Sequence, residues 1–144
     1  MTVLDKKRLN EHLSERLTTS GFRFTPQREH VYAVLLQKRD HPTAEEVFIR
    51  AKVGMPDISM ATVYNCLDAL VCCGLVRQVT LMRGATRFCP NMKEHCHFYC
   101  DTCESIFDMD LPSSTGLSLP KGFETERLDV TIHGRCPACA QGKK

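Results

Sequence analysis

Residues 59–89 read SMATVYNCLDALVCCGLVRQVTLMRGATRFC, and this stretch decides the fold. Ser59 is a favourable N-cap, and the apolar residues after it recur at helical spacing, which predicts a helix over residues 60–73 that ends at Gly74. Two β-rich runs, 75–81 and 86–89, then flank a turn with a basic residue at its tip, which predicts a hairpin. A helix with a polar outer face followed by a hairpin is typical of a winged helix-turn-helix.

The residues before this stretch predict three more helices. Leu9, Leu13 and Leu17 give residues 5–20 an apolar stripe. Thr25 and Pro26 have the character of N-cap and first helical residue for a helix over 26–38, and a capping box formed by Thr43 and Glu46 opens a helix over 44–53. Four helices and a hairpin predict an N-terminal winged-helix domain over residues 1–89.

The remainder predicts a smaller domain over residues 95–144, joined to the first by a hinge at 90–94. Short strands flank Cys100 on both sides, residues 112–120 are rich in turn formers, and residues 123–133 show a second alternating pattern. The predicted fold class is therefore α+β, with a winged helix-turn-helix domain followed by a small α+β or mostly β domain stitched by metal.

Composition limits the class of protein. The chain has 144 residues and nine cysteines. Four of its first eight residues are charged and no long apolar run follows, which predicts a cytoplasmic protein with reduced thiols and no membrane segment. Residues 1–89 contain 13 Lys and Arg against 9 Asp and Glu, whereas residues 90–144 contain 6 against 8. The mild positive excess of the first part permits nucleic-acid binding without demanding it.

Two Cys-x-x-Cys pairs, Cys100/Cys103 and Cys136/Cys139, are separated by 32 residues. One such turn supplies two thiolates, and two turns complete the tetrahedral set that structural Zn²⁺ prefers. A redox-active pair fits poorly because neither turn lies in a thioredoxin-like βαβ context. Four cysteine ligands leave no open position for chemistry, so the predicted role is structural.

A second group of metal-ligand residues surrounds His95 and His97. Their side chains share one face of a strand because the side-chain period is two. Cys89 lies just upstream, Asp108 lies on the next predicted strand, and His41 comes from the first domain. These five residues predict a metal site that draws on both domains and could act as a switch. Each also has a plainer interpretation: His41 as a turn residue, Cys89 as a small buried side chain, Asp108 as a surface charge.

Over nearly its whole length the chain resembles the ferric-uptake-regulator (Fur) family of bacterial metal-sensing repressors. The combination of Ala-Thr-Val-Tyr with a downstream His-x-His and Cys-x-x-Cys is highly specific. The resemblance rests on five motifs: Arg23-Phe-Thr-Pro-Gln-Arg28, His41-Pro-Thr-Ala-Glu-Glu-Val, Ser59-Met-Ala-Thr-Val-Tyr-Asn65, Gly74-Leu-Val-Arg, and His95-Cys-His-Phe-Tyr-Cys-Asp-Thr-Cys103.

The resemblance implies a homodimer with winged-helix DNA-binding domains, a C-terminal dimerisation domain and a regulatory metal at the domain junction. It implies structural zinc on the four cysteines of the two Cys-x-x-Cys pairs. His41, His95, His97 and Asp108 fall where the peroxide-sensing branch places its Fe²⁺ or Mn²⁺ ligands. Cys89 stands where that branch has an aspartate, and the zinc-sensing branch has a cysteine at this offset. The expected regulatory ion is thus Fe²⁺, Mn²⁺ or Zn²⁺.

The helix after Ser59 is the expected DNA-recognition element. With Val63, Leu67 and Leu70 facing inward, the outer face presents Thr62, Tyr64 and Asn65, whose hydroxyl, ring and amide suit an A·T-rich operator. A homodimer implies that this operator is palindromic double-stranded DNA. Three arginines are candidate phosphate or minor-groove contacts, although each could equally be a solvated surface charge: Arg23, Arg28 and Arg83.

These features together predict a metal-dependent transcriptional repressor that controls metal homeostasis or a peroxide response, and no enzyme. Two other classes remain open. A zinc-ribbon interaction module without DNA binding would explain the modest charge. A zinc hydrolase is the weaker alternative, because no general base lies near the histidines. Cys66, Cys72 and Cys73 are expected to pack within their helix, Cys96 and His133 have no assigned role, and Glu94, Cys96 and Asp110 could form a further metal site.

Overall fold

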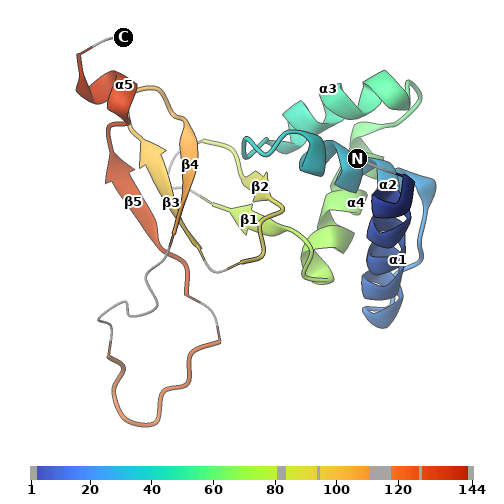
Figure 1. Ribbon diagram of the computed structural model, residues 1–144, viewed down its shortest axis with the longest axis horizontal. Helices are drawn as coiled ribbons and strands as arrows, with labels where there is room; N and C mark the ends of the chain where they lie inside the picture. Colours follow the sequence, from blue (N-terminus) through green and yellow to red (C-terminus); the bar gives the residue numbers. More distant parts are fainter. Residues whose placement is uncertain (1–2, 81–83, 94, 111–117, 127, 143–144) are drawn as a thin grey trace. The chain divides into compact units, whose positions relative to one another are not determined.

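The computed structural model describes residues 3–80, 84–93, 95–110, 118–126 and 128–142, which form two compact units, Met1–Met92 and Lys93–Lys144. The first unit contains four helices and a two-stranded sheet (Figure 1): α1 (Val3–Thr19), α2 (Pro26–Gln37), α3 (Ala44–Gly54), α4 (Met60–Cys72), β1 (Arg77–Val79) and β2 (Arg87–Cys89). The predicted winged helix-turn-helix is confirmed. No helix in the described ranges is long and apolar enough to cross a bilayer.

The starts of α2, α3 and α4 lie where the sequence predicts them, whereas α1 begins at Val3 rather than at residue 5. Thr25 accepts a hydrogen bond from the Arg28 N–H and Pro26 occupies the first turn of α2. Thr43 and Glu46 form the predicted capping box at the start of α3, and Ser59 accepts from the Thr62 N–H at the start of α4. Each cap satisfies a backbone donor that the first helical turn leaves without a partner, which stabilises a helix by about 1 kcal/mol.

The end of α4 is fixed by Gly74. Its φ of 75° lies in the left-handed region that glycine adopts without a steric cost. The Gly74 N–H donates to the Val71 carbonyl at 3.1 Å, and the Leu75 N–H donates to the Leu70 carbonyl at 3.0 Å. These two bonds form a Schellman motif. Arg16 of α1 adds two hydrogen bonds to the Cys73 carbonyl, 3.1 Å from Nε and 2.7 Å from Nη2.

The core of the first unit lies among its four helices and is closed by the hairpin. The α4 residues predicted to face inward, Val63, Leu67 and Leu70, are all fully buried. Burying one such side chain contributes about 1.5–3 kcal/mol. The core also includes residues of the other helices and of the segment after α4: Leu13, Leu17, Val31, Val34, Leu35, Val47, Leu75, Val76 and Phe88.

The hairpin of β1 and β2, which forms the wing, is shorter than the sequence predicts. Strands β1 and β2 pair antiparallel with Arg77 opposite Cys89 and Val79 opposite Arg87. The pairing begins at Arg77 and leaves Leu75 and Val76 outside the strand. Both of these residues are buried in the helical core. Residues 81–83, at the expected hairpin tip, lie outside the described residues.

The second unit is a three-stranded sheet with a short helix (Figure 1): β3 (His95–Cys100), β4 (Ile106–Asp110), β5 (Thr131–Gly134) and α5 (Pro137–Ala140). Strand β3 is central, antiparallel to β4 and parallel to β5. The last strand of this unit, β5, thus lies beside its first, β3. The sequence does not predict α5. The strand expected from alternation over residues 123–133 is wrong for residues 123–126 and 128–130, which form no strand.

The two faces of this sheet differ in character. The strand register puts His97 opposite Asp108 and His95 opposite Asp110, so these side chains share one face. The other face contains Cys96 opposite Met109, and Phe98 between Phe107 and Ile132. One face is therefore polar with metal-ligand residues, and the other is apolar.

Candidate metal centres and DNA-binding surface

The four cysteines of the two Cys-x-x-Cys pairs meet at one end of the three-stranded sheet. Cys100 ends β3, Cys103 lies in the turn that follows, and Cys136 and Cys139 come from the N-cap and the third residue of α5. Their sulfur atoms lie within 4.8 Å of one another. Cys136 caps α5 without a side-chain hydrogen bond, so its sulfur remains directed to the cluster.

Backbone amides favour thiolates in this cluster. The N–H groups of Cys103 and Cys136 point to the Cys100 sulfur at 3.5 and 3.3 Å and lower the pKa of that thiol to about 6. Hydrogen bonds from Ser105 lower the pKa of Cys103. The pKa of Cys139 is instead raised to about 12, first by its contact with the Cys136 sulfur. Four crowded sulfurs thus cannot all ionise without a cation, and a dication such as Zn²⁺ supplies that charge.

Two histidines and one carboxylate converge on the polar face of the same sheet. The Nε2 atoms of His95 and His97 lie 3.0 Å apart, and Asp108 Oδ1 lies 3.4 and 3.3 Å from them. His95 Nδ1 lies 2.6 Å from the Lys93 carbonyl, which can only accept. The proton of neutral His95 is therefore on Nδ1, and Nε2 keeps its lone pair for a ligand. Both imidazoles are buried.

The first unit brings a further pair of donors together. His41 precedes α3 and Cys89 ends β2, yet the imidazole nitrogen and the sulfur lie within 4.8 Å of each other. Their elements are joined because the Phe88 N–H donates to the Pro42 carbonyl at 2.9 Å. Both side chains are buried. An imidazole and a thiol at this spacing suit a borderline-soft divalent metal.

The outer side of α4 exposes two of its three predicted DNA contacts to solvent. Tyr64 and Asn65 are exposed, whereas Thr62 is half-buried and its hydroxyl lies 2.9 Å from the Ser59 hydroxyl. The Tyr64 hydroxyl donates to Glu45 of α3 at 3.2 Å. Partial desolvation and the Glu45 carboxylate raise the Tyr64 pKa, so the ring is neutral at physiological pH.

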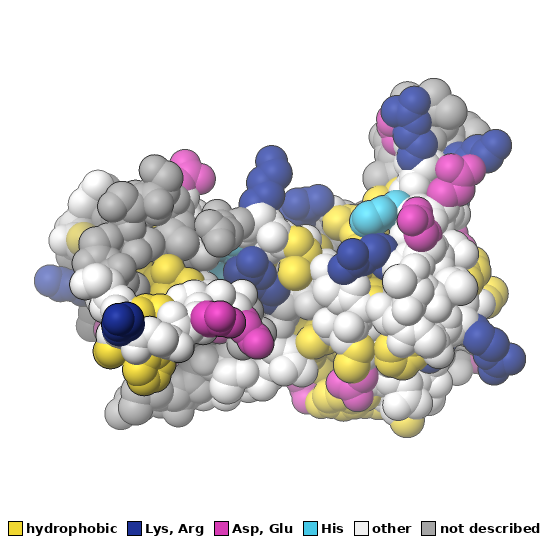
Figure 2. Space-filling model, turned by 90° about the horizontal axis from the view of Figure 1, so that it is seen from below, with side chains coloured by type: hydrophobic (Ala, Val, Ile, Leu, Met, Phe, Trp, Pro, Cys, Tyr) yellow, Lys and Arg dark blue, Asp and Glu magenta, His cyan; other side chains and the backbone are white. Residues whose placement is uncertain are grey.

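The predicted arginine contacts differ in their surroundings. Arg23 is exposed, whereas Arg28 is half-buried, donates to the Arg23 carbonyl at 2.6 Å and lies over the Phe22 ring. Arg83 lies outside the described residues. Figure 2 shows Lys and Arg side chains spread among acidic and apolar ones on the face in view, without one continuous basic patch. Such a surface is consistent with the mild charge excess of the sequence.

Cys66 and Cys72 of α4 and Cys73 at its C-cap are expected to pack as buried thiols of their helix. Cys66 and Cys73 do so, and burial raises the pKa of the Cys66 thiol to about 11. The expectation is wrong for Cys72, which is exposed because it falls on the outer side of the helix.

The suggested further site of Glu94, Cys96 and Asp110 is not assembled by the described residues. The register places Cys96 and Asp110 on opposite faces of the sheet, and Glu94 lies outside the described residues. His133 is exposed and lies 3.5 Å from Asp101, with its ring against Tyr99.

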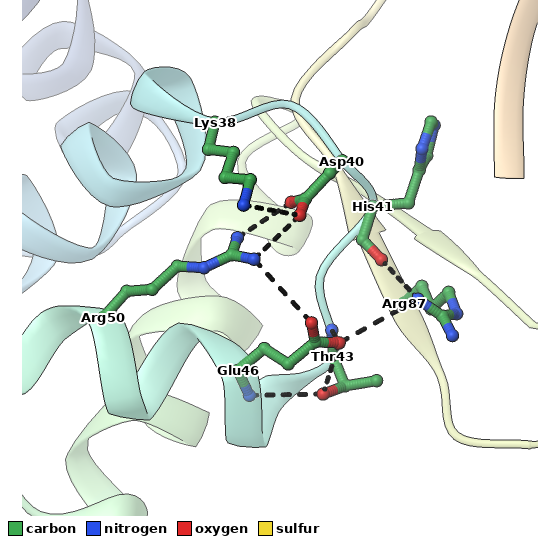
Figure 3. Close-up of polar contacts among 7 residues, drawn as sticks. All are labelled: Lys38, Asp40, His41, Thr43, Glu46, Arg50 and Arg87. Carbon is green, nitrogen blue, oxygen red and sulfur yellow. Dashed lines mark hydrogen bonds and ion pairs between the residues drawn. The ribbon is translucent and has the colours of Figure 1, made fainter. Parts of the chain in front are cut away.

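Three charged residues around His41 are not predicted by the sequence motifs. Asp40 lies in the loop that carries this histidine, and Arg50 and Arg87 bind the loop from α3 and β2 (Figure 3). A local signal exists only for Arg50, which follows Glu46 at the i, i+4 spacing of helical ion pairs. Arg87 approaches through strand placement, which a single sequence does not reveal.

The sequence model of the ferric uptake regulator family matches residues 19–133. The chain belongs to this family. The match spans all the metal-ligand candidates except Cys136 and Cys139, and it includes α2 to α4 and the wing. The family resemblance that the sequence motifs indicate is thereby confirmed.

Relatives and solved structures agree with this assignment. The peroxide-responsive repressor PerR of Staphylococcus aureus is 33% identical over 128 residues, which cover 85% of this chain and 86% of the relative. The Campylobacter jejuni peroxide stress regulator is 27% identical with a TM-score of 0.68, and the alignment covers 96% of this chain and 100% of that one. The Helicobacter pylori ferric uptake regulator, 20% identical with 94% and 93% covered, has the same fold at a TM-score of 0.76.

Family membership defines the class of function. The chain is a metal-dependent transcriptional repressor of metal homeostasis or peroxide response, and such proteins bind DNA operators as dimers. Family members are regulators rather than enzymes. Its cofactors are a structural Zn²⁺ and a regulatory Fe²⁺, Mn²⁺ or Zn²⁺, for which the thiol cluster and the imidazole–carboxylate group offer suitable donors.

Proposed function

We propose that this repressor holds its structural zinc on Cys100, Cys103, Cys136 and Cys139. A separate regulatory ion takes His41 and Cys89 from the first unit and His95, His97 and Asp108 from the second. Such an ion links residues 1–89, the DNA-binding domain, to residues 95–144, the dimerisation domain, across a hinge at 90–94. Binding or loss of the ion would then change which arrangements of the two domains are accessible.

The convergence of His95, His97 and Asp108 carries this proposal. Two imidazole nitrogens 3.0 Å apart, both within 3.4 Å of one carboxylate oxygen, form a donor group in which both imidazoles are buried and Asp108 is exposed. Two buried imidazoles in such close contact are costly unless a proton or a cation joins them. The His41–Cys89 pair supports the proposal independently, because its two donors belong to distant parts of the sequence.

The proposed DNA partner is an A·T-rich, palindromic operator. In a homodimer, the two α4 helices would enter successive major grooves and place Tyr64 and Asn65 against base edges, with Thr62 beside them. Arg23, Arg28 and Arg83 are proposed to contact the sugar–phosphate backbone. An electrophoretic mobility shift on an A·T-rich palindrome that disappears with a chelator and returns with metal would support this assignment. Metal-independent binding would contradict it.

The chemistry of Cys89 favours Zn²⁺ as the regulatory ion. A thiolate is a soft ligand, and zinc accepts mixed sulfur, nitrogen and oxygen donors in tetrahedral sites. A zinc-homeostasis regulator is therefore our first proposal. Peroxide sensing through Fe²⁺ is the second candidate, favoured by 33% identity to a peroxide-responsive repressor.

The deciding experiment is elemental analysis of the wild type beside Cys89→Asp, both produced with iron and zinc supplied. Two zinc ions per wild-type chain, with iron gained only by the variant, would support zinc sensing. One zinc with one iron or manganese in the wild type would support the second candidate. A single zinc in both proteins would refute the regulatory site.

A further inference from the structure

The loop between α2 and α3 holds His41 in an unusual backbone conformation. Its φ is 55°, in the left-handed region that residues other than glycine rarely adopt. The loop is short, since α2 ends at Gln37 and Thr43 already caps α3. The direction of the imidazole therefore depends on contacts that keep this conformation in place.

One set of contacts comes from α3. Arg50 donates from Nη1 and Nη2 to the two carboxylate oxygens of Asp40, each at 2.8 Å (Figure 3). This parallel fork fixes the carboxylate in orientation as well as position. Arg50 Nη2 also lies 3.7 Å from Glu46, and Lys38 lies 3.8 Å from Asp40. The residue immediately before His41 is thus fastened to the helix after it.

A second set of contacts comes from the wing. Arg87 of β2 donates from Nη1 to the His41 carbonyl at 3.1 Å, as Figure 3 shows. The next carbonyl, that of Pro42, accepts from the Phe88 N–H at 2.9 Å. Arg87 Nη1 also lies 3.9 Å from Glu46, the partner of Thr43 in the capping box. The backbone after His41 is therefore tied to the strand that ends in Cys89.

We infer that Arg50 and Arg87 are positioning residues, which preset His41 as a ligand of the regulatory metal. This inference rests on the proposed function, because it takes His41 to be a ligand. Arg50 restrains the loop before His41 and Arg87 restrains it after, so the left-handed turn is determined from both sides. Without these restraints the residue relaxes to an extended or helical conformation and the imidazole turns away from Cys89.

The alternative is that Arg50 and Asp40 form an ordinary surface pair. Exposed ion pairs contribute little to stability, and the Asp40 side chain is 37% exposed. Residues that orient a metal ligand instead typically change metal affinity by about 10–100-fold when they are lost. The two interpretations therefore differ in metal affinity and agree in predicting little change in thermal stability.

The test is a competitive Co²⁺ titration of zinc-loaded wild type, Arg50→Gln, His41→Ala and the double variant. Lys52→Gln is the matched control, because it removes one positive charge from the same helix. We expect Arg50→Gln to bind Co²⁺ about 10–100-fold more weakly than the wild type. The double variant should be no weaker than His41→Ala alone, since Arg50 acts through that side chain. Lys52→Gln should match the wild type.

The outcomes separate this inference from the proposed function. If His41→Ala weakens Co²⁺ binding but Arg50→Gln does not, the positioning role is refuted and the ligand stands. If His41→Ala binds Co²⁺ like the wild type, His41 is not a ligand. The positioning role of Arg50 and the proposed ligand set are then both refuted. If Arg50→Gln folds poorly, two other variants replace it. Asp40→Asn removes the partner of Arg50, and Arg87→Gln removes the hydrogen bond to the His41 carbonyl. Each should weaken Co²⁺ binding as Arg50→Gln is expected to do. Faster amide exchange over residues 38–43 in the metal-free variants would be a readout independent of metal.

Discussion

At the scale of single residues, burial decides which thiols of this cysteine-rich chain can react. Only the thiolate is a strong nucleophile, and burial disfavours the charged form. Cys66 and Cys73 are buried with raised pKa values, whereas Cys72, next to Cys73 in the sequence, is exposed. Neighbouring residues at the end of α4 therefore differ in reactivity because one is buried and the other is exposed.

We predict that iodoacetamide at pH 8 modifies Cys72 in the native zinc-loaded protein and spares Cys66. With a pKa of about 11, Cys66 is only about one part in a thousand thiolate at that pH, and its sulfur is also shielded. Peptide mass spectrometry after timed alkylation measures both sites. Denatured protein is the control, in which both must be modified. Equal rates at the two sites in the native protein would show that α4 opens readily.

At the scale of elements, the end of α4 illustrates how one glycine can hold two structural roles. Gly74 has a φ of 75°, and a Cβ there would lie 2.6 Å from Nη2 of Arg16. Gly21, after α1, has a φ of 86°, and a Cβ at that position would meet nothing within 4 Å. A side chain at either position would carry the backbone cost of a left-handed conformation. Only a side chain at Gly74 would also clash with a neighbouring residue.

Gly74→Ala should destabilise the protein more than Gly21→Ala. The left-handed conformation costs each alanine about 1–2 kcal/mol. At Gly74 the new methyl group must also displace Arg16 from the Cys73 carbonyl, which adds the loss of about one charged hydrogen bond, roughly 1.5–3 kcal/mol. Urea unfolding of the zinc-loaded variants measures the free energy of unfolding. Equal losses would mean that Arg16 relocates without cost.

The elements were predictable to the extent that their signals are local. Thr25, Thr43 and Ser59 mark the helix starts because a cap satisfies backbone groups within three residues of itself. The alternating pattern of residues 123–133 was misleading because an alternating segment forms a strand only where it pairs with another strand. Among its described residues, pairing begins at Thr131. The ligands of the candidate site were predictable as residue types. Arg50 and Arg87 were not, because their contacts depend on how α3 and β2 meet the His41 loop.

At the scale of the whole molecule, the second unit has an apolar sheet face that a dimer could cover. Phe107, Met109 and Ile132 are each about 40% exposed, although they share this face with Phe98. Exposed apolar groups of this kind mark interaction surfaces. Because the family's regulators act as dimers, we expect the same face of a second chain to pack against this one.

We predict that Phe107→Asp converts the zinc-loaded protein from dimer to monomer. A carboxylate in the centre of an apolar interface loses its hydration and finds no cation there. Light scattering coupled to size-exclusion chromatography measures the mass. Val53→Asp is the matched control, because Val53 is an exposed apolar residue of the first unit at 87% exposure and should leave the dimer intact. A dimeric Phe107→Asp would locate the interface elsewhere.

The two units also differ in what stabilises them. The described apolar core lies entirely between Leu13 and Phe88, in the first unit. Among the described residues of the second unit, the buried ones are His95, Cys96, His97, Cys100 and Cys136, most of which are proposed metal ligands. A domain whose interior consists of ligands depends on its metal for folding, because the binding free energy is part of the folding free energy.

Removal of zinc should therefore unfold the second unit and leave the first one folded. We expect a chelator, or the variant Cys136→Ser, to abolish amide protection in β3 and β5 while α2 and α4 keep theirs, because their packing involves no metal. Hydrogen exchange followed by mass spectrometry resolves the two units, and Cys72→Ser is the control for loss of a cysteine that lies outside the cluster. Simultaneous loss of protection in both units would show one cooperative fold. Retained protection in both would show that the four cysteines do not hold the second unit together.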